Sequence, residues 1–189
     1  MMRVVLRAAL LGLSFCVSTQ ALARVEVKPA HNNKLGEVLA IRVTEDIAPG
    51  DYEALLRDLR AHPGKFARKI ALLDSIGGSV SEAMRMGRLL RESGFDTWVP
   101  TNSVCQGSCV YLLVAGRQKH VSGYVGLHRP YFPKGDSMLA NSAAGSAFGA
   151  AAYLREMGAP QSLFDDMQRI DPGKLRLLSK DDLARYRLQ

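Results

Sequence analysis

The sequence predicts an α/β protein, a single domain built around a largely parallel sheet. Short apolar segments rich in β-branched residues alternate along the chain with segments whose apolar residues recur at helical spacing. The 189 residues suffice for one core, and no linker or internal repeat divides them. With 47% hydrophobic and 23% charged residues, the composition excludes disordered, collagen-like and disulfide-scaffold proteins.

Residues 1–23 have the pattern of a secretory signal peptide and precede the domain of residues 24–189. Two arginines and no acid come first, an apolar run covers Ala8–Val17, and Ala21–Ala23 forms an A-x-A cleavage site. We expect the mature chain to start near Arg24 and to be periplasmic or secreted. The apolar run is too short to span a bilayer as a helix, so a retained membrane anchor is the alternative, and no other stretch is apolar enough to cross a membrane.

Loss of the signal peptide changes both the charge and the cysteine count. It removes two arginines and no acid, so the net charge falls from +7 to +5, which outside the cytoplasm does not indicate nucleic acid as a partner. It also removes Cys16, which leaves Cys105 and Cys109 as an even pair.

The predicted elements begin with two strands joined by a helix. Val38–Val43 is apolar and rich in β-branched residues, as strands are, and Lys69–Asp74, with an apolar centre, is expected to be a second, more buried strand. Between them, Asp51 is expected to cap a helix over residues 52–61, whose leucines lie on one face.

The second half of the chain continues the pattern with shorter elements. Ser79 and Glu82 have the spacing of a capping box, which predicts the start of a helix. The remaining expected elements are, in chain order, a strand over 97–99, a buried helix over 110–115, strands at Val121 and over 125–127, a long helix over 140–157, and a strand from Leu175 followed by a helix that Ser179 caps.

Asp74–Val80 is the first segment with possible chemistry, a strand that ends in two glycines before a capped helix. Glycine permits a positive φ and close backbone approach, so backbone N–H groups here could face a ligand. A tight strand-to-helix turn explains the same residues. The segment lacks the lysine of a P-loop and the third glycine of a dinucleotide-binding fingerprint.

Cys105–Cys109 is the second segment and contains Ser108 at another strand-to-helix junction. A serine there can be exposed beside N–H groups that stabilise an oxyanion. The two cysteines are either a disulfide or two buried thiols. Their spacing is not that of a thioredoxin motif, and no second ligand pair indicates zinc, so we expect neither metal nor cofactor.

His128 is the third candidate and ends a short predicted strand in Gly126–Pro130. A lone histidine is more often structural than catalytic, and the residues around His128 are compatible with either role.

Taken in order, these segments resemble the Clp protease/crotonase superfamily. Asp74–Val80 is similar to its Asn-Ser-Pro-Gly-Gly-Ser-Val segment, Val110–Gly116 to the helix after its nucleophile, and Leu127–Pro130 to its Ile-His-Gln-Pro. Arg176–Leu183 resembles the closing Arg-Phe-Leu-Ser segment. The nearest likeness is to an exported bacterial branch with Cys-x-Ser-Ala-Cys at the active-site turn.

The resemblance implies a fold of repeated β-β-α units and a Ser-His-Asp peptidase acting on peptide or protein. His128 would be the general base, and the oxyanion hole would use the N–H groups of Gly78 and of Cys109, the residue after Ser108. Members of this superfamily often assemble into trimeric or larger rings, so a homo-oligomer is an open expectation.

Two departures from the family pattern leave activity open. The nucleophile position falls on Gly107 and not on Ser108, and one residue of shift on a helix turns a side chain by about 100°. The position of the orienting acid falls on Leu175, which leaves Asp171 as the candidate acid. The sequence therefore supports two hypotheses, a serine hydrolase with Ser108 and His128, or a non-catalytic descendant that binds peptide or a partner protein. A redox switch at Cys105 and Cys109 is a third.

Overall fold

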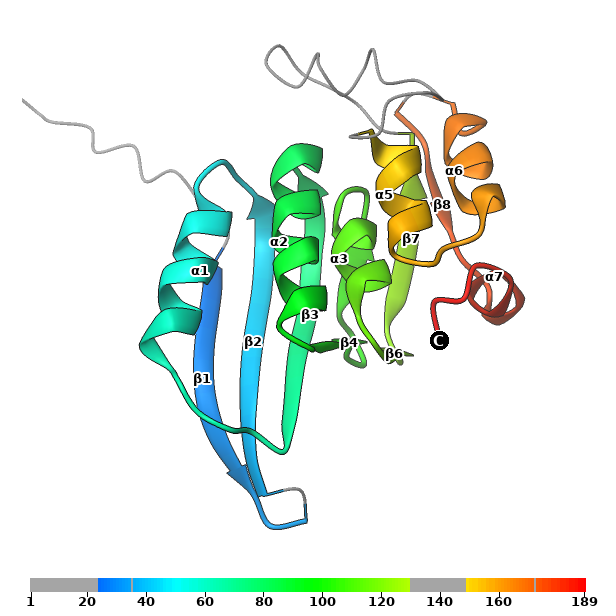
Figure 1. The fold of residues 1–189 in the computed structure, drawn as a ribbon. Coiled ribbons are helices and arrows are strands. Elements are labelled where there is room, and N and C mark those ends of the chain that lie inside the picture. Colours follow the sequence, from blue (N-terminus) through cyan, green and yellow to red (C-terminus); the bar gives the residue numbers. More distant parts are fainter. Residues whose placement is uncertain (1–23, 35, 130–148, 172) are drawn as a thin grey trace, which may run out of the picture.

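The computed structural model describes residues 24–34, 36–129, 149–171 and 173–189 (Figure 1). These residues form a single α/β domain with a mixed eight-stranded sheet and six helices. The predicted signal peptide lies outside the described residues, as do residues 140–148 of the long predicted helix. None of the described helices is long and apolar enough to cross a membrane.

The sheet branches at its third strand. Its strands are β1 (Arg24–Asn32), β2 (Gly36–Ile47), β3 (Arg68–Gly78), β4 (Asp96–Val99), β5 (Val104–Gln106), β6 (Lys119–Val121), β7 (Tyr124–His128) and β8 (Leu175–Leu177). The first part of β3 pairs with β4, through residues 70–72, whereas Ser75 further along pairs with Cys105 of β5. One branch continues to β6 and the other to β7 and β8.

Five of the seven strand pairings are parallel, as expected, and the two antiparallel ones lie at the ends of the sheet. The sequence did not predict β1, which pairs along its whole length with β2 through a tight hairpin. β1 alternates charged and apolar residues and exposes most of them, so it lacks the apolar run by which the other strands are recognised.

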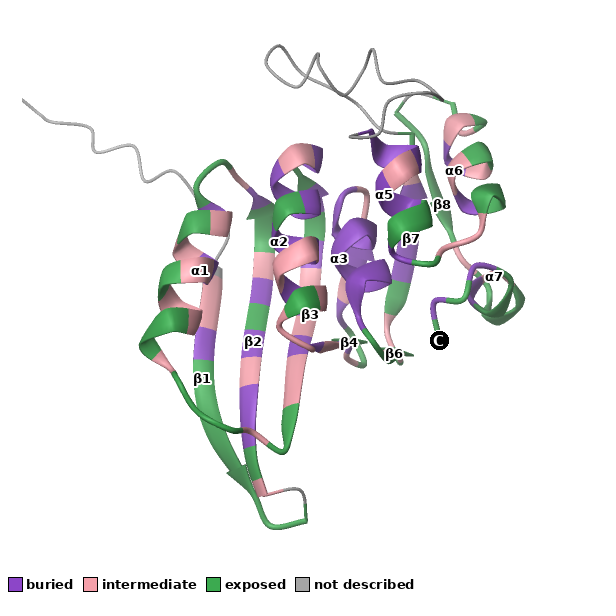
Figure 2. Cartoon of the chain, viewed as in Figure 1, coloured by how far each residue is buried: buried purple, intermediate pink, exposed green. Residues whose placement is uncertain are grey.

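The helices are α1 (Asp51–Ala61), α2 (Val80–Glu92), α3 (Cys109–Ala115), α5 (Ala150–Glu156), α6 (Gln161–Gln168) and α7 (Lys180–Arg185). α1, α2 and α3 cover one face of the sheet (Figure 1). Every residue of α3 is buried, which places this helix at the centre of the core (Figure 2). An all-apolar helix is stable in water only when neighbours surround it, and α2 and the branches of the sheet do so.

Two helix starts differ in detail from their predictions. Gly50, not Asp51, is the N-cap of α1. The Asp51 carboxylate instead accepts a hydrogen bond from Ala48 N at 2.8 Å. Burial of this carboxylate raises the pKa of Asp51. Ser79 does cap α2, because its Oγ accepts from Glu82 N. The Glu82 carboxylate does not complete the capping box but accepts from the backbone N–H groups of Gly50 and Tyr52, at 2.9 and 2.8 Å.

The closing segment follows its prediction. Leu175–Leu177 is a strand, and Ser179 with Asp182 forms a complete capping box at the start of α7. The N–H groups of a first helical turn need acceptors from outside the helix. Here the Ser179 hydroxyl accepts from the N–H of Asp182, only three residues away. Local pairing of this kind is predictable from sequence, whereas the partner that Glu82 finds on α1 is not.

Candidate functional site

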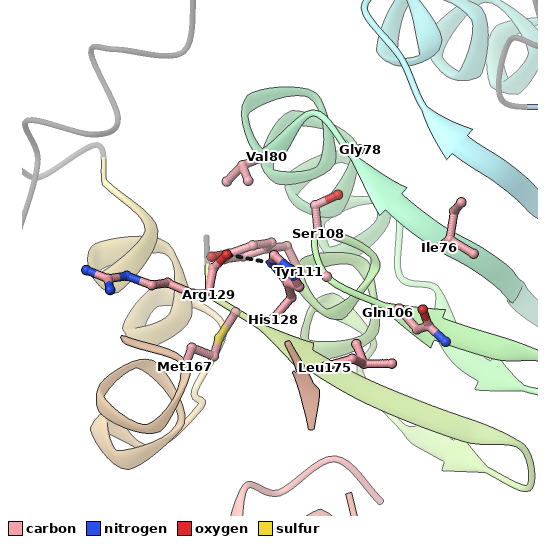
Figure 3. A pocket seen from close by; sticks show the side chains of 11 residues that line it. Ile76, Gly78, Val80, Gln106, Ser108, Tyr111, His128, Arg129, Met167 and Leu175 are labelled. Atoms are coloured by element: carbon pink, nitrogen blue, oxygen red, sulfur yellow. Dashed lines mark hydrogen bonds between the residues drawn. The ribbon is translucent and has the colours of Figure 1, made fainter. Parts of the chain in front are cut away.

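A cavity of about 350 Å³ opens at the carboxyl ends of β3, β5 and β7 (Figure 3). Such a position outside parallel strand ends is where open α/β sheets bind ligands. The cavity is lined by Ile76, Gly78, Val80, Gln106, Gly107, Ser108, Tyr111, His128, Arg129, Met167 and Leu175. It therefore combines apolar walls with a few polar groups, the usual make-up of a ligand pocket.

The double glycine that ends β3 lets this strand contact the turn before α3. An added Cβ on Gly77 would lie 2.8 Å from the carbonyl oxygen of Gln106 and 2.9 Å from Ser108 N. Gly77 and Gly78 both have positive φ, at 102° and 138°. Gly77 thus lets β3 approach the turn before α3 closely, and the chain passes from Gly78 at the end of β3 into α2 at Val80, which confirms the predicted tight turn.

Ser108 stands at the start of α3 and is 5% exposed. Its Oγ is buried and has no hydrogen-bond partner among the described residues. Gly107, onto which the nucleophile position of the superfamily that the sequence resembles falls, adopts a φ of 54° and lines the same cavity. The positive φ is unfavourable for a serine, so the exchange of glycine and serine at 107 and 108 suits the backbone of this turn.

The structure contains the Cys105–Cys109 disulfide, which confirms the first of the two predicted alternatives. It joins the end of β5 to the first residue of α3 across a Cα–Cα distance of 5.2 Å, and both side chains are fully buried. The bond closes the three-residue turn that carries Ser108. The backbone of Ser108 is therefore held covalently as well as by packing.

We expect loss of this disulfide to destabilise the domain. Replacing both cysteines with alanine removes the constraint that the bond places on the unfolded chain, which for so short a loop amounts to about 2 kcal/mol of unfolding free energy. Urea denaturation measures the difference, and the same two proteins compared in the presence of a reductant, where neither has the bond, are the control. Intact mass spectrometry tests the bond itself, because reduction of one disulfide adds two hydrogens. A wild-type mass that does not change on reduction would show that the bond is absent.

His128 is the last residue of β7 and is partly buried. Its Nδ1 lies 2.7 Å from the carbonyl oxygen of Arg129, shown as the dashed line in Figure 3. A carbonyl only accepts, so in the neutral ring Nδ1 carries the proton and Nε2 keeps its lone pair. The structure records no hydrogen bond between His128 and Ser108 in the described part of the chain, although both line the cavity.

Asp171, the candidate acid, is not brought to the site. Its carboxylate pairs with Lys174 Nζ at 3.0 Å, its side chain is 69% exposed, and it does not line the cavity. The register of β7 with β8 places Leu175 opposite His128, so an apolar side chain stands where an orienting carboxylate is needed. The expected Ser-His-Asp triad is therefore not assembled; Ser108 and His128 share the pocket without it.

Tyr111 is the lining residue that the sequence did not single out. Its side chain is 1% exposed, and its hydroxyl, like that of Ser108, has no hydrogen-bond partner among the described residues. Burial raises the pKa of this phenol, which keeps it protonated. The available signal was its spacing of three residues from Ser108, which puts both on one side of a helical turn.

No family model and no curated protein matches the chain. Its function is accordingly inferred from the chemistry of the pocket. In the described ranges no group of three or more His, Cys, Asp and Glu side chains is placed to hold a metal ion.

Proposed function

We propose that the protein is an exported serine hydrolase, a peptidase, that uses Ser108 as nucleophile and His128 as general base. The observation that carries this proposal is the buried Ser108 Oγ, which has no partner among the described residues and belongs to a pocket that His128 also lines. A buried hydroxyl without a partner is costly, and such groups are retained where function uses them.

The proposed reaction needs the Ser108 side chain to rotate toward His128 when substrate enters. His128 Nε2 then takes the hydroxyl proton while Oγ attacks the carbonyl carbon of the peptide bond. The backbone N–H groups of Gly78 and Cys109 would stabilise the negative oxygen of the tetrahedral intermediate. His128 returns the proton to the leaving amine, and water releases the acyl group from Ser108 by the same steps.

The carbonyl of Arg129 takes over one task of the missing acid. In a triad the carboxylate holds the imidazole in the tautomer that leaves Nε2 free, and the 2.7 Å contact from Nδ1 to this carbonyl supports the same tautomer. A carbonyl is neutral and stabilises the imidazolium less than a carboxylate does. We therefore expect a slow enzyme, which works as a dyad.

Export is supported by two independent features. Residues 1–23 have the pattern of a cleaved signal peptide. The mature domain contains a disulfide, and disulfides persist in oxidising compartments such as the periplasm or the cell exterior.

Labelling with a fluorophosphonate probe tests the proposed nucleophile. We expect the wild-type protein to be labelled at Ser108, as located by mass spectrometry, and the Ser108→Ala variant not to be labelled. Ser162→Ala is the matched control, because Ser162 is exposed on α6 and does not line the pocket. A folded wild-type protein that is never labelled would refute the hydrolase.

The second candidate function is a non-catalytic domain that binds a peptide or a partner protein in the same pocket. It is favoured by the absence of a carboxylate among the described lining residues, which leaves His128 without an acidic partner there. Under this function, Ser108→Ala and His128→Ala leave the biological phenotype intact, whereas the hydrolase predicts that either change abolishes it.

A further inference from the structure

We infer that Tyr111 is a ligand-binding residue of this pocket, whose hydroxyl donates a hydrogen bond to an oxygen of an apolar acyl or carboxylate ligand. This deepens the proposed function, because it names a part of the substrate that the pocket recognises.

Tyr111 and Tyr153 form a matched pair in the core. Their rings meet edge to face, with centroids 5.7 Å apart, and both side chains are buried. The Tyr153 hydroxyl donates to the carbonyl oxygen of Tyr111 at 2.7 Å. The fold therefore provides an acceptor for one of two adjacent phenols and none, among the described residues, for the other.

The unpaired phenol is the one that lines the cavity. Buried tyrosine hydroxyls ordinarily find a partner, and a phenylalanine would fill the same space without the cost of an unmet hydrogen bond. The position of Tyr111 is therefore explained if its partner is a molecule that enters the pocket.

Ser108 supplies a second hydroxyl to the same pocket. The two residues are joined within the first turn of α3, where Tyr111 N donates to the Ser108 carbonyl oxygen at 3.0 Å. Both hydroxyls are more than nine-tenths buried and both lack a partner in the described part of the protein. A ligand with two oxygens, such as a carboxylate, or a carbonyl beside an amide, can pair with both.

The charges and walls of the pocket define the ligand further. No carboxylate lies among the described lining residues, whereas the hydroxyls of Ser108 and Tyr111 can both donate, so the pocket favours oxygen acceptors over cations. Val80, Met167 and Leu175 provide apolar walls that suit an aliphatic side chain. N-acetyl-leucine combines an aliphatic side chain, an amide carbonyl and a carboxylate, and it is the type of product that a peptidase releases.

The binding test uses N-acetyl-leucine and isothermal titration calorimetry. It compares Ser108→Ala with the Ser108→Ala, Tyr111→Phe double variant, so that no hydrolysis contributes. We expect the loss of the phenol to raise Kd at least about tenfold, the usual effect of removing one partner of a buried hydrogen bond. Equal affinities, or no binding to the wild-type protein, would overturn the inference.

A stability test does not depend on any ligand. Tyr111→Phe removes an unpaired hydroxyl and is expected to leave the melting temperature unchanged or higher. Tyr153→Phe removes a hydroxyl that donates to the carbonyl oxygen of Tyr111. This variant is expected to have a melting temperature lower by about 2–4 °C. An equal fall in both variants would show that the Tyr111 hydroxyl is bonded in the free protein, and the inference would be wrong.

These outcomes separate the inference from the hydrolase. If Ser108 is never labelled by fluorophosphonate but Tyr111→Phe weakens N-acetyl-leucine binding, the pocket binds such ligands without hydrolysing them. If Ser108 is labelled and Tyr111→Phe binds normally, the hydrolase stands and the role of Tyr111 is refuted.

Discussion

A Gly78→Ala variant is expected to lose more than about 4 kcal/mol of unfolding free energy, a large part of the roughly 5–15 kcal/mol that stabilises a typical domain. A Cβ at this position would lie 2.2 Å from the carbonyl oxygen of Ile47 and 2.7 Å from its nitrogen. Both atoms belong to the backbone of β2, which pairs with β3 at this residue. Relief of the clash therefore requires the two central strands to separate.

Gly158→Ala is the matched control for this effect. Gly158 also has a positive φ, at 78°, but an added Cβ there meets nothing within 4 Å. The control therefore carries the backbone strain of alanine in the left-handed region, about 1–2 kcal/mol, without the steric clash. Urea denaturation followed by circular dichroism compares the two variants. Equal losses would show that the contact between Gly78 and Ile47 is not what requires glycine.

The clash at Gly78 also bears on the site. Ser79 N donates to the same Ile47 carbonyl, at 2.8 Å, so the turn from β3 into α2 is held against β2 at two successive residues. In the proposed mechanism Gly78 offers its N–H to the oxyanion. A fixed backbone suits this role, because a preorganised donor needs no rearrangement during the reaction.

A His128→Ala variant is expected to lower kcat/KM for ester and peptide substrates by about 10²–10⁴-fold, the range that general base catalysis contributes. The residue is partly buried at the end of β7, and its one recorded side-chain hydrogen bond among the described residues is to the adjacent carbonyl. Its removal should therefore change the unfolding free energy by no more than about 0.5 kcal/mol. Steady-state kinetics on the variant, with thermal unfolding of the same sample, separates catalysis from stability.

His120→Ala controls for the loss of a histidine elsewhere on the sheet. His120 is exposed on β6, where it meets the ring of Trp98 edge to face and lies within hydrogen-bond distance of Ser122. It does not line the pocket, so its removal should leave the rate unchanged. A His128→Ala variant that hydrolyses at the wild-type rate would show that another group, or water, takes the proton from Ser108.

Much of the fold was predictable because its signals are local. Apolar runs predicted β2 and β3, and the apolar segment after Cys109 predicted α3. Such runs are recognisable because an element buried on all sides needs no polar face. β1 was missed because it lies at the edge of the sheet and its residues are mostly exposed. Its pairing with β2 depends on backbone hydrogen bonds, which leave no pattern in side chains.

The site was predictable in part for the same reason. Ser108 lies just beyond β5 and His128 ends β7, and the short motifs around them, through the resemblance to the superfamily, named both residues as candidates before the structure placed them on one pocket. Asp171 was assigned by its distance along the chain. The antiparallel register of β7 and β8, which no local pattern fixes, puts Leu175 beside His128 and leaves Asp171 with Lys174 at the surface.

By itself the sequence determined the α/β class, the cap of α2 at Ser79 and the cap of α7 at Ser179, and it left Cys105 and Cys109 as a disulfide or two buried thiols. Each of these depends on residues within a few positions of one another, whose separation the chain fixes. Only the tertiary structure decided that Glu82 holds the start of α1, that Gly78 contacts β2, and that Ser108 and Tyr111 line one pocket with hydroxyls that have no partner among the described residues. These depend on the register and packing of elements distant in the chain, which many residues set together.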